Sequence, residues 1–175
     1  MERKTTSRAV ISKDLQVQIF QRDRWLCHWC RRPVIFAPAM RYLEQLVKRG
    51  GFTDSLAYHD PRWRRDKAPL LDHLGAVIDH VEAYSRGGKC EEGNFVTACN
   101  KCNGRKSNAP ATNFTARSPL LRIKGKYGEP TDWDGLSRLF LMLAEQDLQC
   151  ATPSELEWLR ALRGAGQPRD HHPVE

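Results

Sequence analysis

The sequence predicts an α+β fold, because two short strand patterns lie among longer stretches with the apolar spacing of helices. The strand patterns are Ala76–Ile78, which leads into Asp79-His80, and Phe95–Ala98. A turn built on Gly87-Gly88 lies between them, so we expect the two strands to form a hairpin. Helical patterns occur before and after this hairpin and predict added helices around a small sheet.

Two helices are expected ahead of the hairpin. Ser12 can cap the first, which should run from about Lys13 to Gln21 with an apolar face of Leu15, Ile19 and Phe20. The second should begin near Pro38 and end at Gly50-Gly51, with an apolar stripe of Met40, Leu43, Leu46 and Val47. Residues 52–69 have no regular pattern and predict an irregular, basic and aromatic loop.

Further helices are expected after the hairpin. One should run from Asn100 to about Asn108 and end ahead of Pro110. Apolar residues then recur at helical spacing at Trp133, Leu136, Leu139, Phe140 and Leu143, and again at Leu156, Leu159 and Leu162. The capping-box pattern Thr152-Pro153-Ser154-Glu155 precedes the last group, and Gly164 follows it.

Composition limits the class of protein. The 175 residues include no run of about 18 apolar residues, which argues against a membrane span. No membrane is expected among the partners. The first residues lack the apolar core of a signal peptide, so we expect a cytoplasmic protein with reduced cysteines.

The net charge of +7 is concentrated in clusters. Arg22, Arg24, Arg31 and Arg32 flank the first cysteine pair, Arg62, Arg64 and Arg65 surround Trp63, and Arg105 and Lys106 follow the second cysteine pair. Such grouping favours a polyanionic partner over a merely solvated surface, since phosphate contacts supply most of the affinity for nucleic acid.

Four of the six cysteines form two Cys-x-x-Cys pairs, Cys27/Cys30 and Cys99/Cys102. The two-residue spacer lets one tight turn direct both sulfurs at a common centre, and two such turns provide a tetrahedral zinc site. A disulfide framework is disfavoured in a reducing compartment, and a thioredoxin-like redox pair would explain only one of the two pairs. We therefore predict one structural Zn²⁺.

The other two cysteines, Cys90 and Cys150, have no paired spacing. Cys90 lies in a polar turn, where an exposed thiol with no role is the simplest interpretation. Cys150 follows a helix and is expected to be packed. Neither is included in the predicted zinc site.

A further set of motifs occurs in a fixed order along the chain. After Cys27/Cys30 come Asp79-His80, Gly87-Gly88, Asn94-Phe95 and Cys99-Asn100-Lys101-Cys102-Asn103-Gly104-Arg105-Lys106. The ordered set resembles the HNH endonuclease family, in its four-cysteine, zinc-containing branch. The resemblance covers roughly residues 12–33 and 75–108. It implies a ββα-metal core with a structural zinc site and added helices, and a metal-dependent endonuclease that hydrolyses DNA phosphodiester bonds.

The resemblance also implies roles for individual residues. His80 is the general base, since a neutral imidazole with a pKa of about 6.5 can accept a proton at neutral pH. Asn94, in the hairpin loop, holds the loop and helps to orient the histidine. Asp79 and Asn103 are the ligands of the catalytic divalent ion. Asn103 stands where the family has its final histidine, and its amide oxygen favours Mg²⁺ or Mn²⁺.

Some positions allow two interpretations. Asp72-His73 repeats the Asp-His dipeptide, but Gly75 and the shorter route to the cysteines make Asp79-His80 the better match. Lys106 is either a phosphate contact or a solvated helix residue. The segment Tyr58 to Arg65 is either a DNA-contacting loop or a packed insert. His28 and His59 are expected to be ordinary surface residues.

The expected nucleic-acid contacts are the basic residues of two clusters: Arg62, Arg64, Arg65, Arg105 and Lys106. The partner is expected to be double-stranded DNA. Because one metal site cuts one strand, a double-strand break needs a homodimer or two successive nicks.

The expected organisation has four parts. Residues 1–112 form the nuclease core, with an inserted helix-loop segment at about 34–74. Residues 113–131 form a linker, 132–164 a C-terminal helical extension and 165–175 a flexible tail.

Two other classes of function fit part of the pattern. The first is a catalytically inactive, zinc-stabilised nucleic-acid-binding module, which needs basic residues and zinc but not the set of Asp79, His80 and Asn103. The second is a small structural zinc protein that mediates protein–protein contacts, which predicts neither cleavage nor salt-sensitive DNA binding.

Overall fold

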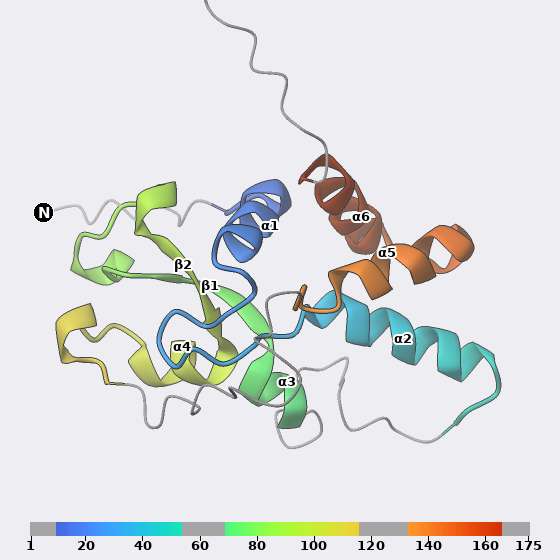
Figure 1. Cartoon of the computed structure of the whole chain (residues 1–175), viewed down its shortest axis with the longest axis horizontal. Coiled ribbons are helices and arrows are strands. Elements are labelled where there is room, and N and C mark those ends of the chain that lie inside the picture. The colour runs from blue at the N-terminus through green and yellow to red at the C-terminus, as the bar shows by residue number, and fades with distance from the viewer. Residues whose placement is uncertain (1–9, 54–68, 116–132, 166–175) are drawn as a thin grey trace, which may run out of the picture.

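The computed structural model describes residues 10–53, 69–115 and 133–165 and shows helices around a two-stranded sheet (Figure 1). The fold is α+β, as the sequence predicts. The elements are α1 (Lys13–Arg22), α2 (Ala37–Arg49), α3 (Pro69–Leu74), β1 (Ala76–His80), β2 (Phe95–Cys99), α4 (Asn100–Lys106), α5 (Ser137–Gln146) and α6 (Pro153–Ala165). Single 3₁₀ turns occur at Tyr84–Arg86, Glu92–Asn94, Ala111–Asn113 and Leu148–Cys150.

Strands β1 and β2 form the predicted antiparallel hairpin. His80 pairs with Phe95 at the end of β1 that leads into the connecting loop, and Ala76 pairs with Cys99 at the other end. The loop turns at Gly87, which has φ 93. At Gly88 a Cβ atom would lie 1.9 Å from the carbonyl oxygen of Glu82, so only glycine allows this close approach. Helix α4 follows β2 directly and packs on both strands.

The helix starts that the sequence predicts are present at both ends of the chain. Ser12 Oγ accepts a hydrogen bond from the backbone N–H of Leu15 at 3.2 Å and caps α1. Before α6, Thr152 Oγ accepts from the N–H of Glu155 at 3.3 Å, while Glu155 Oε2 accepts from the N–H of Thr152 at 2.8 Å. This reciprocal pair is the expected capping box.

Two helix boundaries differ from the expectation, and one short helix was not expected. Helix α5 begins at Ser137, because the Asp134 carboxylate accepts from the backbone N–H groups of Leu136 and Arg138 and caps it there. Helix α4 ends at Lys106, since Ser107 adopts a left-handed φ of 49. The six-residue helix α3 was not expected, because a segment so short shows no helical period.

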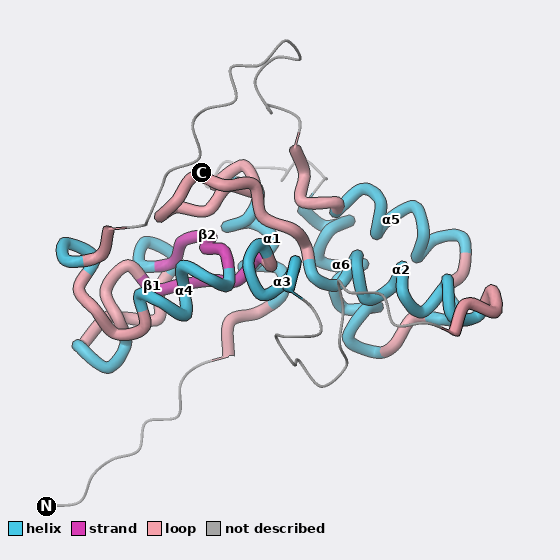
Figure 2. Tube along the Cα trace, turned by 90° about the horizontal axis from the view of Figure 1, so that it is seen from below, coloured by secondary structure: helices cyan, strands magenta, loops and turns pink. Residues whose placement is uncertain are grey.

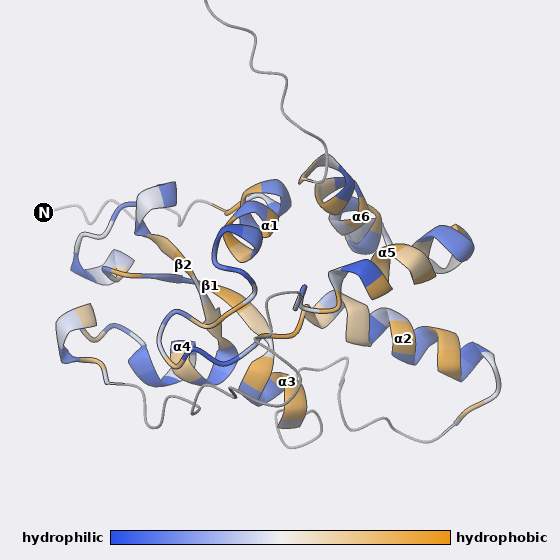
Figure 3. Ribbon diagram, viewed as in Figure 1, coloured by the Kyte–Doolittle hydropathy of each residue, from blue (hydrophilic) through white to orange (hydrophobic). Residues whose placement is uncertain are grey.

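The elements form two neighbouring groups. Strands β1 and β2 with α4 lie at one end of the molecule and α2, α5 and α6 at the other, with α1 and α3 between them (Figure 2). Helix α1 packs on α6 and on β2, and α2 packs on α5. Figure 3 shows apolar and polar residues on different faces of the helices, as amphipathic helices around a core require.

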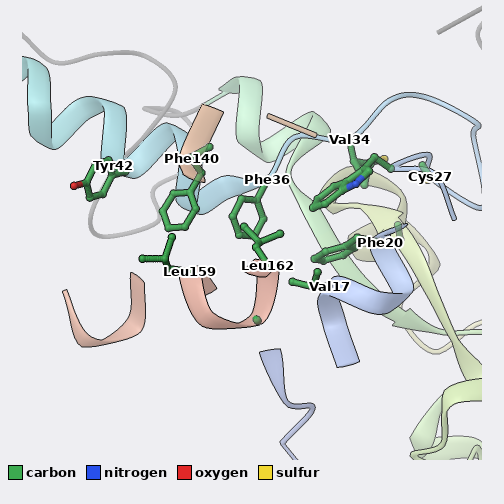
Figure 4. Packing of buried hydrophobic residues seen from close by; sticks show 14 of the residues in the cluster. Val17, Phe20, Cys27, Val34, Phe36, Tyr42, Phe140, Leu159 and Leu162 are labelled. Atoms are coloured by element: carbon green, nitrogen blue, oxygen red, sulfur yellow. The ribbon is translucent and has the colours of Figure 1, made fainter. Parts of the chain in front are cut away.

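One hydrophobic core runs through both groups. Its buried members come from α1, the first cysteine turn, α2, β2, α4, α5 and α6. Phe36, which is 1% exposed, packs on the ring of Phe140 with centroids 5.5 Å apart (Figure 4). It also packs on the ring of Trp158, with centroids 5.1 Å apart, and both contacts are near-perpendicular. The described residues between the first cysteine pair and β1 therefore supply part of the core.

An ion pair between a half-buried arginine and a buried carboxylate also joins α2 to α6. Arg41 Nε lies 3.3 Å from Oε1 of Glu155, a carboxylate with no exposed surface. In the described part of the chain no helix is long and apolar enough to cross a membrane. Most of the predicted linker and almost all of the predicted tail lie outside the described residues, as does the loop with Arg62, Arg64 and Arg65.

Candidate functional site

The two Cys-x-x-Cys pairs come together at one buried centre. The Sγ atoms of Cys27, Cys30, Cys99 and Cys102 all lie within 4.8 Å of one another. Cys30 Sγ and Cys99 Sγ are 3.8 Å apart. Four thiolates at about 2.3 Å from a tetrahedral zinc ion are separated by about 3.8 Å, so the donors and their spacing both fit zinc.

Contacts among these sulfurs, and their burial, shift the pKa values of three of the four thiols in different directions. Sulfur hydrogen bonds from Cys27 and Cys99 lower the pKa of Cys30 to about 2, whereas burial raises the pKa of Cys102 to about 12. Hydrogen bonds to Cys27 and Cys30 raise the pKa of Cys99 as well. Four buried thiolates at this spacing would repel one another, so a bound cation is what allows all four to be ionised.

Backbone hydrogen bonds fix the two cysteine turns. In the first, the N–H of Arg31 donates to the carbonyl of Cys27 at 2.8 Å, and Arg31 itself has a left-handed φ of 61. The N–H of His28 donates to the carbonyl of Thr97 at 2.8 Å and attaches this turn to β2. In the second, Cys99 is the N-cap of α4 and its Sγ accepts from the N–H of Cys102.

Asp79 lies on β1, is 5% exposed and has a partner at each carboxylate oxygen. The indole N–H of Trp29 donates to Oδ2 at 2.8 Å. The ammonium of Lys106 lies 3.5 Å from Oδ1. Trp29 belongs to the first cysteine turn, and Lys106 lies on α4, the helix that begins in the second cysteine turn.

Lys106 differs from both sequence interpretations, which placed it at the surface. It is 1% exposed, and its Nζ donates to the backbone carbonyl of His80 at 2.7 Å. A buried ammonium needs partners because its desolvation is costly, and here the His80 carbonyl and the Asp79 carboxylate supply them. In this structure the side chain is directed inward and not toward a phosphate in solution.

His80 ends β1, is 3% exposed and lies against two side chains of the hairpin. The ring of Phe95, its partner in the strand register, packs on it edge to face at 4.9 Å. Its Nε2 lies 3.6 Å from Sγ of Cys90, within hydrogen-bonding distance for sulfur. Cys90 is thus half-buried against the histidine, and the interpretation of it as an exposed thiol with no role is not supported.

Asn94 spans the loop between the strands with three side-chain hydrogen bonds. Its Oδ1 accepts from the N–H of Glu82 at 2.8 Å, and its Nδ2 donates to the carbonyls of Glu82 at 3.0 Å and Lys89 at 2.9 Å. This geometry is what a residue that holds the loop requires.

Asn103 and Arg105 lie on α4. Asn103 is half-buried, and within the described residues its amide makes no side-chain hydrogen bond. It is three positions before Lys106, and residues so spaced are neighbours on a helix surface. Arg105 is exposed, with its guanidinium 5.8 Å from the centre of the Phe114 ring.

The second Asp-His dipeptide occupies a different setting. Asp72 and His73 lie on α3, where the histidine is exposed. Asp79 and His80 are buried at the end of a strand instead.

The segment that holds Asp79, His80, Asn94 and the second cysteine pair matches a known family. Residues 69–109 match the family model described as HNH endonuclease. This segment is therefore similar to an HNH domain. The match lies on the segment from α3 to the end of the α4 region, and it confirms the family resemblance read from the sequence. No curated protein and no solved structure matches the chain significantly.

Two residues that contact Asp79 or His80 were not singled out as site residues from the sequence. Trp29 lies inside the first Cys-x-x-Cys pair, and this placement next to a metal-binding turn was the available signal. Cys90 lies ten residues after His80, in the hairpin loop, and no spacing rule identifies it.

An HNH domain indicates a nuclease in general, and therefore a nucleic-acid substrate.

Proposed function

We propose that this protein is a metal-dependent endonuclease that hydrolyses DNA phosphodiester bonds at its HNH domain. The observation that carries the proposal is the placement of Asp79 and His80 at the end of β1, opposite a loop that Asn94 holds. The order of β1, β2 and α4 supports the interpretation of residues 76–106 as a ββα-metal core.

His80 is the proposed general base. Its ring is held between the Phe95 ring and the Cys90 thiol, which limits its orientation. Its backbone carbonyl is held by Lys106. A neutral imidazole in this position accepts the proton of the attacking water, and hydrolysis leaves 5′-phosphate and 3′-hydroxyl ends.

Asp79 and Asn103 are the proposed ligands of the catalytic ion. A carboxylate and an amide oxygen form a hard donor set that suits Mg²⁺ or Mn²⁺. Such an ion, when bound, neutralises charge that develops on the scissile phosphate and the leaving oxygen. The 3.5 Å contact between Asp79 and Lys106 is long for a hydrogen bond, which supports Oδ1 as the oxygen available to the ion.

DNA binding is the remaining part of the proposal. Arg105 is exposed on α4, the helix that carries Asn103, and is a proposed phosphate contact. Arg62, Arg64 and Arg65 are proposed backbone contacts on sequence grounds alone. The partner is proposed to be duplex DNA, with a homodimer or two nicks needed for a double-strand break.

Cleavage of supercoiled plasmid tests this function. Zinc-loaded protein should convert supercoiled plasmid to the nicked form with Mg²⁺ or Mn²⁺, and a chelator should stop the reaction. Activity should return when Mg²⁺ is added in excess of the chelator, because the buried cysteine site retains its zinc during a short exposure. Salt-sensitive DNA binding without cleavage would instead support the inactive zinc-stabilised binding module.

A further inference from the structure

We propose that Trp29 and Lys106 are positioning residues for Asp79, one contributed by each cysteine pair. This inference rests on the proposed function of Asp79 as a ligand of the catalytic ion. Trp29 lies between Cys27 and Cys30, and Lys106 lies on α4, one helical turn after Cys102. The folding of both cysteine turns around their metal therefore places one side chain on each oxygen of the carboxylate.

Trp29 sets the direction of the carboxylate. Its indole N–H donates to Asp79 Oδ2 at 2.8 Å, in a half-buried setting. The indole is itself held by edge-to-face contacts with His28 at 4.7 Å and Phe114 at 5.4 Å. Because the donor is neutral and its ring is fixed, it orients Asp79 without competing for its charge, which leaves Oδ1 for a cation.

Lys106 places a positive charge beside the Asp79 carboxylate and holds the end of β1 through the His80 carbonyl. Its ammonium donates to the carbonyl of His80 at 2.7 Å, lies 3.5 Å from Asp79 Oδ1 and lies 5.3 Å from the centre of the Trp29 ring. These three groups surround an ammonium with almost no exposed surface. A divalent ion on Asp79 shares that carboxylate with the ammonium, and two like charges at one buried group repel.

The two positioning residues should therefore have opposite effects on ion affinity. Loss of the Trp29 N–H removes an orienting hydrogen bond and should weaken the binding of a divalent ion. Loss of the Lys106 charge removes a repulsion and should strengthen that binding. Loss of either should slow cleavage, because the carboxylate or the His80 carbonyl is then held less well. If both residues had only a structural role, their loss would not change the affinity for the divalent ion in opposite directions.

The test compares Trp29→Phe and Lys106→Met in the zinc-loaded full chain. Mn²⁺ affinity is measured by electron paramagnetic resonance, which needs no cleavage. We expect affinity to fall by about tenfold in Trp29→Phe and to rise by about threefold or more in Lys106→Met. The rate constant kcat should fall by about tenfold in each, with the KM for DNA little changed. Where Lys106→Met does not fold, Lys106→Gln removes the charge while it keeps a donor for the His80 carbonyl.

Matched controls exist for both changes. Trp158→Phe alters a tryptophan of the core, and Lys101→Met removes an exposed lysine from α4. Neither should change Mn²⁺ affinity. Unchanged affinity in Trp29→Phe, or weaker binding in folded Lys106→Met and Lys106→Gln, would overturn the proposal while leaving the nuclease function intact.

A second measurement separates this inference from the proposed function. The indole ¹H–¹⁵N resonance of Trp29, assigned by its loss in Trp29→Phe, reports the contact with Asp79 directly. It should shift in Asp79→Asn and in Lys106→Met but not in Lys101→Met. If the protein neither binds Mn²⁺ nor cleaves DNA, the proposed function fails, and these shifts still show whether the contacts exist. An indole resonance that is insensitive to Asp79→Asn would refute the contacts themselves.

Discussion

The side chain of Asn94 forms a two-point hydrogen-bonded pair with the backbone of Glu82. Its Oδ1 accepts from the Glu82 N–H at 2.8 Å and its Nδ2 donates to the Glu82 carbonyl at 3.0 Å. Glu82 follows the end of β1 by two residues, and Asn94 directly precedes β2. The pair therefore closes the loop at its base and holds the strand end that carries His80.

Replacement of Asn94 should loosen this closure. We expect Asn94→Ala to lower the free energy of unfolding by about 1–3 kcal/mol, because three backbone groups lose their partner. Asn94→Asp should be no better, since two carbonyls would then face a carboxylate oxygen in place of an N–H donor. Denaturant unfolding measures both, with the exposed Asn108→Ala as the control. Equal stability of Asn94→Ala and Asn108→Ala would show that the loop does not depend on the pair.

His80→Ala tests the proposed base. Cleavage should fall by about 10²–10⁴-fold, while zinc content and DNA affinity stay near wild type, because a base acts in the transition state and affinity comes from phosphate contacts. The matched control is His73→Ala, which removes the exposed histidine of the other Asp-His dipeptide. Loss of cleavage in His73→Ala with retention in His80→Ala would assign the base to α3.

Local patterns in the sequence were enough to predict much of this fold. The Gly87-Gly88 pattern predicts the hairpin turn. The structure gives the reason for glycine there, since a Cβ at Gly88 would collide with the Glu82 carbonyl. The capping box at Thr152 and Glu155 predicts the start of α6 because both of its hydrogen bonds lie within one turn of chain. The cysteine pairs predict one metal centre because each needs only a tight turn.

Contacts between distant segments could not be predicted in this way. Lys106 is typical of an exposed helix residue by type, and only its approach to β1 brings it to the His80 carbonyl and makes it buried. Trp29 reaches Asp79 because the hydrogen bond of His28 to Thr97 attaches the first cysteine turn to β2. Neither contact has a signature in residue spacing, since both depend on how the cysteine turns pack on the hairpin.

Loss of a zinc ligand should unfold the core. Elemental analysis should find one zinc per chain, and Cys99→Ser should lose both zinc and the cooperative unfolding transition, because metal binding and folding are coupled. Cys90→Ser is the matched control, as its thiol lies outside the cluster of four, and it should keep the zinc and the transition. Folded wild-type protein without zinc would contradict this prediction.

The arginine loop can be tested through salt dependence. If Arg62, Arg64 and Arg65 contact phosphates, their joint replacement by Ala should reduce the slope of log K against log salt on duplex DNA by about 2–3 units. Arg105→Ala alone should reduce it by about 1 unit. An unchanged slope in a folded triple variant would favour internal salt bridges and a packed insert.

Asp23 should make the stability of the fold depend on acid pH. Its carboxylate accepts from the N–H of Thr97 at 2.7 Å and pairs with Arg22 at 2.9 Å, and so ties the end of α1 to β2. Burial raises the pKa of Asp23, but the hydrogen bonds from Arg22 and Thr97 outweigh it, so the pKa lies below 3.8. A lowered folded pKa gives stability that is fully present above the unfolded pKa of about 3.9 and lost as pH falls through the folded pKa.

We therefore expect Asp23→Asn to be less stable than wild type at pH 7, with a difference that narrows as pH falls below about 4. Protonation of other carboxylates and release of zinc affect both proteins, so the difference between the two isolates Asp23. The control is Glu157→Gln, because Lys13 lowers the pKa of Glu157 at the surface, where an ion pair contributes little. The free energies of unfolding of wild type and Asp23→Asn are compared from pH 7 down to pH values below the folded pKa of Asp23. If their difference stayed constant, the charge of Asp23 would not be what joins α1 to β2.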